Sequence, residues 1–264
     1  MALAFKFLSN ADLVLQLHLL EREVFLSIWI AVFGALALYL FGKIRMPHDS
    51  DLKSISVGRL FLGLLTLSFT VYLIPGLWGA PLKLISAFPP PMEYSESPLG
   101  LGNAAMVNGE LPKGASYGPN RIVSFEDYED GLAYAKSVNK PILLDFTGRA
   151  CVNCRKMEIN VWSDSKVLPI LSNDVVLISL YVDEHIDLPK EEQFISKTTG
   201  SKIETVGDKW TDFMISKYKT NTQPLYVLTD LEGNSLNTAK PTISYVSVEE
   251  YLKWLKDGIS KFEK

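Results

Sequence analysis

Cys151 and Cys154 are the only cysteines in this chain of 264 residues, and their spacing suits dithiol chemistry. They follow a short apolar run, 142–146, that is bounded by Pro141 and Gly148 and is too short for a helix of its own. The pattern predicts a buried strand, a turn and a helix that opens at Cys151. Unpaired N–H groups and the positive dipole end at a helix N-terminus favour a thiolate. We therefore expect Cys151 to be the nucleophile, with a lowered thiol pKa, and the more buried Cys154 to resolve the mixed disulfide.

There are two other interpretations of the cysteine pair. A structural zinc site needs four ligands, usually with a second cysteine or histidine pair at close spacing. The three histidines, His18, His48 and His185, are scattered along the chain. The other interpretation is a pair of unrelated buried thiols, but Cys-x-x-Cys between a strand and a helix favours redox chemistry. We expect no metal and no cofactor besides a redox-active Cys151–Cys154 disulfide.

Two carboxylates accompany the cysteines. Asp145 interrupts the apolar strand, and an unpaired charge buried there costs several kcal/mol, so we expect a raised pKa. The alternative is an aspartate that faces solvent at the end of the strand. Glu158 lies four residues after Cys154, on the same helix face. It either tunes the dithiol or lies on a solvated helix surface.

The first third of the chain is apolar enough to predict a membrane anchor. Residues 24–41 form an uncharged run, and residues 60–78 form a second run of similar length; each is long enough to span a bilayer. The loop between them contains four basic residues: Lys43, Arg45, Lys53 and Arg59. Basic loops stay in the cytoplasm, so both ends of this hairpin would face the periplasm of a bacterium. Two buried core helices are the alternative.

The predicted division of the chain follows its composition. We expect residues 1–22 to be an interfacial lead-in or the truncated edge of a longer protein, and residues 23–88 to hold both spans and an interfacial segment. Residues 89–120, rich in Pro, Gly, Ser and Asn, predict an extended linker, with a loop packed on the next domain as the alternative. From 121 to 264, strands and helices alternate, which is typical of an α/β layer fold. The net charge of −4 offers no basic face, so we expect no nucleic-acid partner.

The C-terminal elements can be placed approximately from periodicity and turn residues. The expected strands are 122–125, 142–146, 175–182, 225–229 and either 235–236 or 243–245. The expected helices are 126–138, 151–162, 167–171, 212–218 and 248–259. The polar stretch 184–211 is longer than a normal connection, and we expect it to be an insertion.

The strand–Cys-x-x-Cys–helix unit, Asp145, the Gln223–Pro224 strand entry and the closing helix together resemble the thioredoxin fold. The segment 146–158, preceded by apolar spans, is further similar to the C-terminal part of a DsbD-type thiol:disulfide interchange protein. Residues 75–83 are similar to versions from Bacteroidetes. The resemblance implies two transmembrane helices followed by an α/β thioredoxin-like domain.

The resemblance also implies roles for individual residues. Asp145 would shuttle the proton of the Cys154 thiol, and Glu158 would tune the same dithiol. A cis peptide bond is expected at Gln223–Pro224, opposite the cysteines. The predicted partner-binding residues are Gln223, Pro224, Val152 and Asn153.

The function implied is a protein-disulfide reductase of the bacterial inner membrane, with its thioredoxin-like domain in the periplasm. Electrons would come from a membrane core of the DsbD or CcdA type and pass to periplasmic disulfide-bonded proteins, including those of cytochrome c maturation. This chain has no transmembrane cysteines and two spans, so we expect either a fragment, which we favour, or a separate core protein. Membrane lipid is the other expected partner. A thiol oxidase or isomerase and a non-catalytic membrane adaptor are the alternatives.

Overall fold

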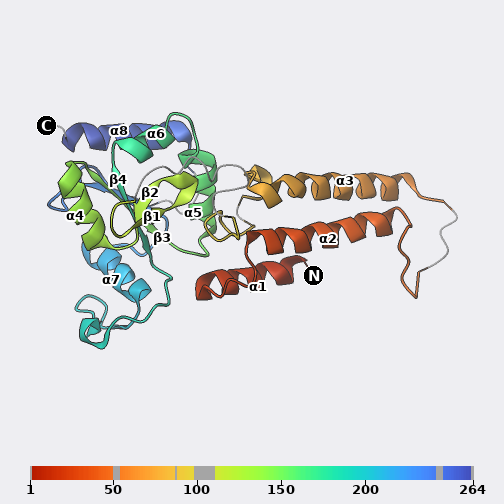
Figure 1. The fold of residues 1–264 in the computed structure, drawn as a ribbon, viewed down its shortest axis with the longest axis horizontal. Coiled ribbons are helices and arrows are strands. Elements are labelled where there is room, and N and C mark those ends of the chain that lie inside the picture. Colours follow the sequence, from red (N-terminus) through yellow and green to blue (C-terminus); the bar gives the residue numbers. More distant parts are fainter. Residues whose placement is uncertain (1, 50–53, 87, 98–110, 242–245, 263–264) are drawn as a thin grey trace. The chain divides into compact units, whose positions relative to one another are not determined.

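The computed structural model describes residues 2–49, 54–86, 88–97, 111–241 and 246–262. The chain divides into two compact units, Met1–Val107 and Asn108–Lys264. The first unit is helical and the second is built on a β-sheet, as Figure 1 shows. Each unit is described separately below.

The described residues of the first unit form three helices and two short 3₁₀ turns. These are α1 (Ala2–Leu15), α2 (Arg22–Leu40), α3 (Val57–Leu73), η1 (Ile74–Trp78) and η2 (Lys83–Ile85). Helices α2 and α3 run side by side (Figure 1). Ser56 caps α3 by accepting a hydrogen bond from the backbone N–H of Arg59. The buried core of this unit is aromatic and aliphatic: Phe25, Leu26, Trp29, Leu73 and Leu82.

Two segments of this unit, Arg22–Leu40 and Val57–Trp78, are long and apolar enough to cross a membrane. They match the two predicted runs to within three residues at each end. Only 22% of an 18-residue window in each segment is buried within the protein, unlike the mostly buried core helix of a soluble protein. Large apolar side chains on α3 are instead exposed: Leu60, Phe61, Leu62, Leu64, Leu65, Leu67 and Val71. Length, composition and this exposure favour a membrane anchor over the alternative of two buried helices.

The beginning of the predicted linker is wrong, because residues 88–97 are bound to the first unit. The buried Arg22 guanidinium donates a hydrogen bond to the carbonyl oxygen of Pro90 at 2.7 Å. The Tyr94 hydroxyl donates to Oδ2 of the buried Asp12, also at 2.7 Å. Charged groups buried in this unit need hydrogen-bond partners, and the segment after the second span supplies them. The later linker residues, 98–110, lie outside the described residues.

The second unit contains a six-stranded sheet in the order β1-β2-β4-β3-β7-β8. Its strands are β1 (Ala115–Tyr117), β2 (Val123–Phe125), β3 (Ile142–Thr147), β4 (Val176–Tyr181), β7 (Leu225–Thr229) and β8 (Lys240–Pro241). Strands β2, β4 and β3 are parallel, whereas β1, β7 and β8 are antiparallel to their neighbours. The sheet begins at Ala115, six residues before the predicted start of the domain. Every residue of β3 and β4 is buried, as expected for central strands covered on both faces.

Helices cover both faces of this sheet (Figure 1). They are α4 (Tyr128–Val138), α5 (Val152–Met157), the π-helical turn η5 (Glu158–Trp162), α6 (Leu168–Asn173), α7 (Val206–Tyr218) and α8 (Val248–Phe262). In one core, Leu143 of β3 lies with Met157 of α5, Trp162 of η5, Leu171 of α6 and Leu255 of α8. The other core joins Leu144 and Phe146 to Ala135, Trp210 and Met214, from α4 and α7. The alternation of side chains along β3 therefore divides the domain into three layers.

The sequence-based boundaries fail mainly after β4. The predicted insertion 184–211 contains a 3₁₀ turn, η6 (Lys190–Glu192), and a two-stranded ribbon of β5 (Phe194–Ile195) and β6 (Lys202–Ile203). Helix α7 begins at Val206 rather than at residue 212, because Thr205 and Asp208 form a capping box.

The predicted last strand is also displaced. Strand β8 occupies Lys240–Pro241, while Ser235 forms an isolated bridge to Thr229. Residues 243–245, the second predicted position, lie outside the described residues.

Candidate dithiol site

The two cysteines lie where β3 passes through a turn into α5, as the sequence predicts. Cys151 is the N-cap residue of α5, and its sulfur accepts a hydrogen bond from the backbone N–H of Cys154 at 3.2 Å. The two sulfurs form a disulfide, with a Cα–Cα distance of 5.3 Å. Cys154 is 1% exposed, whereas Cys151 is partly exposed. An incoming partner can therefore reach Cys151 but not Cys154.

Asp145 is buried in the centre of the sheet, so the alternative of a solvent-facing carboxylate is wrong. It is 2% exposed, and its Oδ2 accepts a hydrogen bond from the Ser179 hydroxyl at 3.3 Å. Within the described part of the chain, its Oδ1 has no hydrogen-bond partner. Burial raises the pKa of Asp145 to about 7, against the opposing effects of the nearby Arg155 charge and the Ser179 hydrogen bond. The predicted rise in pKa is confirmed.

Glu158 is also buried, so the alternative of a solvated helix surface is wrong. Its Oε2 lies 2.8 Å from Nη1 of Arg155, three residues earlier, and the two side chains are 5% and 7% exposed. At Glu158 the helix widens into the π-helical turn η5, and the Asn120 side chain donates to the Glu158 carbonyl oxygen at 2.7 Å. Sequence reasoning missed Arg155, although its spacing of three residues from Glu158 was a usable signal for an ion pair.

The turn before Cys151 is held by a residue that sequence reasoning did not identify. The Asp183 carboxylate accepts hydrogen bonds from the backbone N–H groups of Arg149 at 2.7 Å and of Ala150 at 3.1 Å. Asp183 lies just beyond the end of β4, and the turn lies just beyond the end of β3. Because these strands are parallel, their carboxyl ends share one edge of the sheet. This topology was the available signal for Asp183.

The Arg149 side chain connects the same turn to the end of β4. Its guanidinium donates to the Glu184 carboxylate at 2.9 and 3.1 Å and to Glu126 at 2.7 Å. It also stacks on the Tyr181 ring, 3.5 Å from the ring centroid. Glu184 is buried and Glu126 is exposed, so the contact with Glu184 is the less screened of the two.

The predicted partner-binding residues lie beside this turn. The Gln223–Pro224 peptide bond is cis, as the resemblance implies, and Pro224 directly precedes β7. A Cβ atom built on Gly148 would lie 2.8 Å from Oε1 of Gln223, so the Gln223 side chain contacts the turn that leads to Cys151. Between the cysteines, Val152 is 40% exposed and Asn153 is partly exposed.

Comparison with protein families matches residues 122–204 to the family described as thioredoxin-like. The second unit is a thioredoxin-like domain. Two solved structures are similar to this chain, each at 19% sequence identity. One is described as "DsbH Oxidoreductase". The match covers 58% of this chain and 92% of the DsbH chain, with a TM-score of 0.36. The other is a thioredoxin from Thermus thermophilus. The match covers 49% of this chain and 81% of the thioredoxin chain, with a TM-score of 0.31. Comparison with curated proteins found no match.

The thioredoxin-like domain with its Cys151–Cys154 disulfide indicates a thiol–disulfide oxidoreductase. In such enzymes a thiolate attacks a disulfide sulfur and forms a mixed disulfide, which a second thiol then resolves. Within the described residues, no group of three or more His, Cys, Asp or Glu side chains is arranged to hold a metal ion. The geometry supports exchange chemistry carried out by the two sulfurs and the groups around them.

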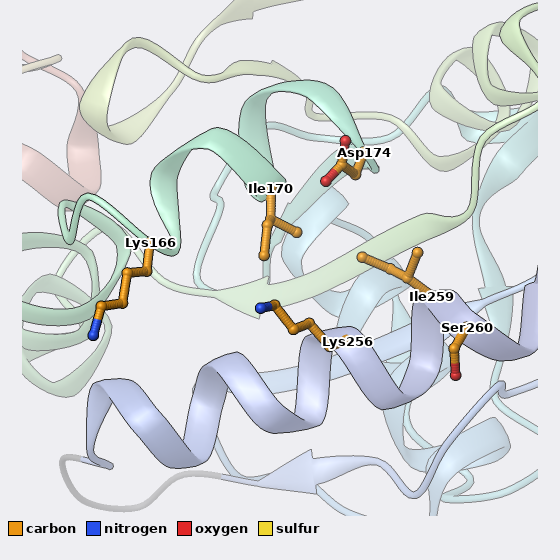
Figure 2. Close-up of a pocket in the computed structure, with 6 residues that line it drawn as sticks. All are labelled: Lys166, Ile170, Asp174, Lys256, Ile259 and Ser260. Carbon is orange, nitrogen blue, oxygen red and sulfur yellow. The ribbon is translucent and has the colours of Figure 1, made fainter.

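The domain also has a hollow of about 440 Å³ between α6 and α8 (Figure 2). Its lining comes from the α6 region and from α8: Lys166, Ile170, Asp174, Lys256, Ile259 and Ser260. None of these residues belongs to the strand–turn–helix unit, and none is a nucleophile suited to thiol exchange. The candidate site is therefore the disulfide and its surroundings.

Proposed function

We propose that this chain is a membrane-anchored protein-disulfide reductase. The observation that carries the proposal is the pairing of a partly exposed Cys151 with a buried Cys154 in a disulfide at the β3–α5 turn of a thioredoxin-like domain. The accessible sulfur of Cys151 can form a mixed disulfide with a partner, and the buried sulfur of Cys154 can resolve it. This asymmetry is what dithiol exchange requires.

The proposed reaction begins with the reduced protein. The Cys151 thiolate attacks one sulfur of a client disulfide; a mixed disulfide forms, and the other client sulfur leaves as a thiolate. The Cys154 thiol then gives up its proton, and its sulfur attacks the sulfur of Cys151. The mixed disulfide breaks and the second client sulfur leaves. Two electrons have passed to the client, and the protein is left with the Cys151–Cys154 disulfide.

Asp145 is proposed to accept the proton of Cys154. A carboxyl group with a pKa of about 7 can exist in either protonation state near neutral pH, which suits a proton acceptor that must be regenerated. Glu158 is proposed to adjust the charge around the same dithiol. Val152, Asn153 and the Gln223–Pro224 segment are proposed to contact the client.

The proposed location is the bacterial inner membrane. The apolar segments Arg22–Leu40 and Val57–Trp78 would span the bilayer, with the basic loop between them in the cytoplasm and the thioredoxin-like domain in the periplasm. The periplasm is oxidising, so a reductase there needs a supply of electrons. The resemblance to DsbD-type proteins supports a membrane core as donor and periplasmic disulfide-bonded proteins, including cytochrome c maturation proteins, as clients.

Insulin reduction by the full chain in detergent micelles tests the proposal. Cys151→Ser should abolish the activity, because the remaining cysteine, Cys154, is buried and cannot reach a client disulfide. Ser172→Ala, an exposed substitution in α6, should leave the activity unchanged and serves as the control. Activity retained by Cys151→Ser would refute the assignment. A Cys154→Ala variant should accumulate the mixed disulfide with its client.

Equilibration with glutathione decides between a reductase and a thiol oxidase. A potential well below about −200 mV supports a reductase, whereas a value near about −120 mV would make the protein an oxidant. A non-catalytic adaptor would be indicated if the double variant Cys151→Ser with Cys154→Ser still complemented a strain that lacks the protein.

A further inference from the structure

We propose that Arg155 is a positioning residue for the dithiol exchange: its buried guanidinium keeps Glu158 as a carboxylate, which leaves Asp145 as the group that takes the Cys154 proton. This inference rests on the proposed function and deepens it. It assigns different tasks to the two buried carboxylates and names the residue that separates them.

The ion pair between Arg155 and Glu158 is the first part of the argument. Arg155 directly follows Cys154 in α5, and Nη1 lies 2.8 Å from Oε2 of Glu158. Both side chains are more than nine-tenths buried. A buried ion pair in direct contact interacts strongly, because little solvent screens it. Glu158 is therefore held in its charged form.

The second part is the weaker support given to Asp145. Its Oδ2 accepts a hydrogen bond from the neutral Ser179 hydroxyl, at 3.3 Å. Arg155 acts on it through space and opposes, without cancelling, the effect of burial. Two carboxylates that share one cation in a poorly hydrated region do not ionise equally, and the one in direct contact keeps the charge. Asp145 is left as the group that binds and releases a proton near neutral pH.

The groups around Asp145 belong to one buried cluster. Asp145, Glu158 and Arg155 all act electrostatically on the Tyr226 hydroxyl, and Asp145 acts on that of Tyr251. The polar and titratable groups that face this cluster come from five elements: Ser179 of β4, Tyr226 of β7, Tyr251 of α8, Arg155 of α5 and Glu158 of η5. The two tyrosines have pKa values raised well above their usual range, so they stay neutral when Asp145 titrates.

This arrangement gives the resolving step a defined proton acceptor. The S–H bond of Cys154 breaks and an O–H bond forms on Asp145, while the sulfur of Cys154 displaces the client sulfur from Cys151. Asp145 then returns the proton to solvent. Without Arg155, the Glu158 carboxyl group would also bind a proton near neutral pH. Glu158 and Asp145 would then both ionise at higher pH.

The test compares Arg155→Met with Arg155→Lys and Glu158→Gln in the full chain in detergent micelles. One readout is the pH at which insulin reduction reaches half of its maximal rate. The other is the infrared carbonyl band of the protonated Asp145 side chain in the oxidised protein, identified by its loss in Asp145→Asn. Lys156→Met, which removes a cation at the neighbouring, less buried position, is the matched control.

We expect Arg155→Met to raise both midpoints by on the order of one pH unit, a tenfold change in proton affinity, because the opposing cation is lost. Arg155→Lys should largely restore them. Glu158→Gln should lower them, since the freed guanidinium then acts on Asp145 alone. Lys156→Met should move neither midpoint.

The inference is overturned if Arg155→Met folds and leaves the infrared midpoint unchanged, or if Glu158→Gln raises that midpoint. Should Arg155→Met fail to fold, the opposite shift expected of Glu158→Gln still decides. If the unmodified protein does not reduce insulin, the proposed function fails, whereas the infrared titration still tests Arg155.

Discussion

Asp145 lies directly opposite Tyr226 in the antiparallel pairing of β3 and β7, and the two side chains are 2% and 1% exposed. The Tyr226 ring contacts Trp162 and Tyr251, with centroids 5.7 and 5.3 Å away, and the Trp162 indole N–H donates to the Tyr251 hydroxyl. The carboxyl group therefore faces an aromatic cluster. This environment excludes water and is the physical cause of its raised pKa.

Asp145→Asn should change how stability depends on pH. In the folded protein the pKa is about 7, raised from an ordinary value of 3.8. A carboxyl group with a raised folded-state pKa contributes stability that is fully present below the ordinary pKa and is lost as the pH rises through about 7. Asp145→Asn removes this loss. At pH 8 the variant should exceed the parent in free energy of unfolding by roughly 4 kcal/mol.

Denaturant unfolding of the full chain between pH 4 and pH 8 measures this effect. Asp174→Asn, which changes an exposed aspartate at the end of α6, is the control and should follow the parent. An Asp145→Asn variant whose stability falls with pH as steeply as that of the parent would show that Asp145 is not the titrating group.

Arg149→Met should destabilise the turn before the dithiol. It leaves the buried Glu184 carboxylate without the guanidinium that contacts it at 2.9 Å, and breaking such a pair from one side costs about 3 kcal/mol. Adding Glu184→Gln should recover part of that loss, because the buried charge is then gone. Glu126→Gln, at the exposed end of the same contact, should cost less than about 1 kcal/mol. Equal losses from Glu184→Gln and Glu126→Gln in the parent would contradict this ranking.

Gly148→Ala should slow insulin reduction. The added methyl would lie 2.8 Å from Gln223 Oε1 and 2.9 Å from Asp183 Oδ2, both closer than a methyl group tolerates. Asp183 is held by two backbone N–H groups, so the turn itself must shift, at a cost of about 1–2 kcal/mol. Combining Gly148→Ala with Gln223→Ala removes one of the two clashes. We expect the double variant to regain part of the stability, and a purely additive result would contradict the contact.

Gly207→Ala should destabilise the packing of α7 against residues 182–184, which lead into the β5–β6 ribbon. A Cβ atom there would lie 2.7–2.8 Å from three backbone atoms, the N and O of Glu184 and the O of Val182, none of which can rotate away. We expect a loss of about 2–3 kcal/mol and faster proteolysis within the ribbon. Gly58→Ala, where no atom lies within 4 Å of the added carbon, is the control. A Gly207→Ala variant as stable and as resistant to protease as this control would contradict the prediction.

The dithiol unit could be predicted because its signals are local. The apolar run of β3, the turn at Gly148 and the Cys-x-x-Cys spacing all lie within about a dozen consecutive residues, and strand and helix periodicity operate over that range. The start of α7 was missed even though its capping residues, Thr205 and Asp208, are local as well. The long polar stretch before them hid the signal. The docking of residues 88–97 was missed because Pro-rich composition says nothing about distant partners such as Arg22.

The sequence alone determined that two sulfurs stand together at the opening of a helix, since neighbours along the chain remain neighbours in any fold. Only the tertiary structure decided which charged groups surround the two sulfurs and how deeply those groups are buried. Asp183 reaches the turn from 34 positions away because β3 and β4 are parallel, and Glu158 is buried because a helix face was covered rather than left in water. Burial depends on every element that covers a residue, and hydration sets the cost of a charge. The proton chemistry of this site is therefore a property of the whole domain.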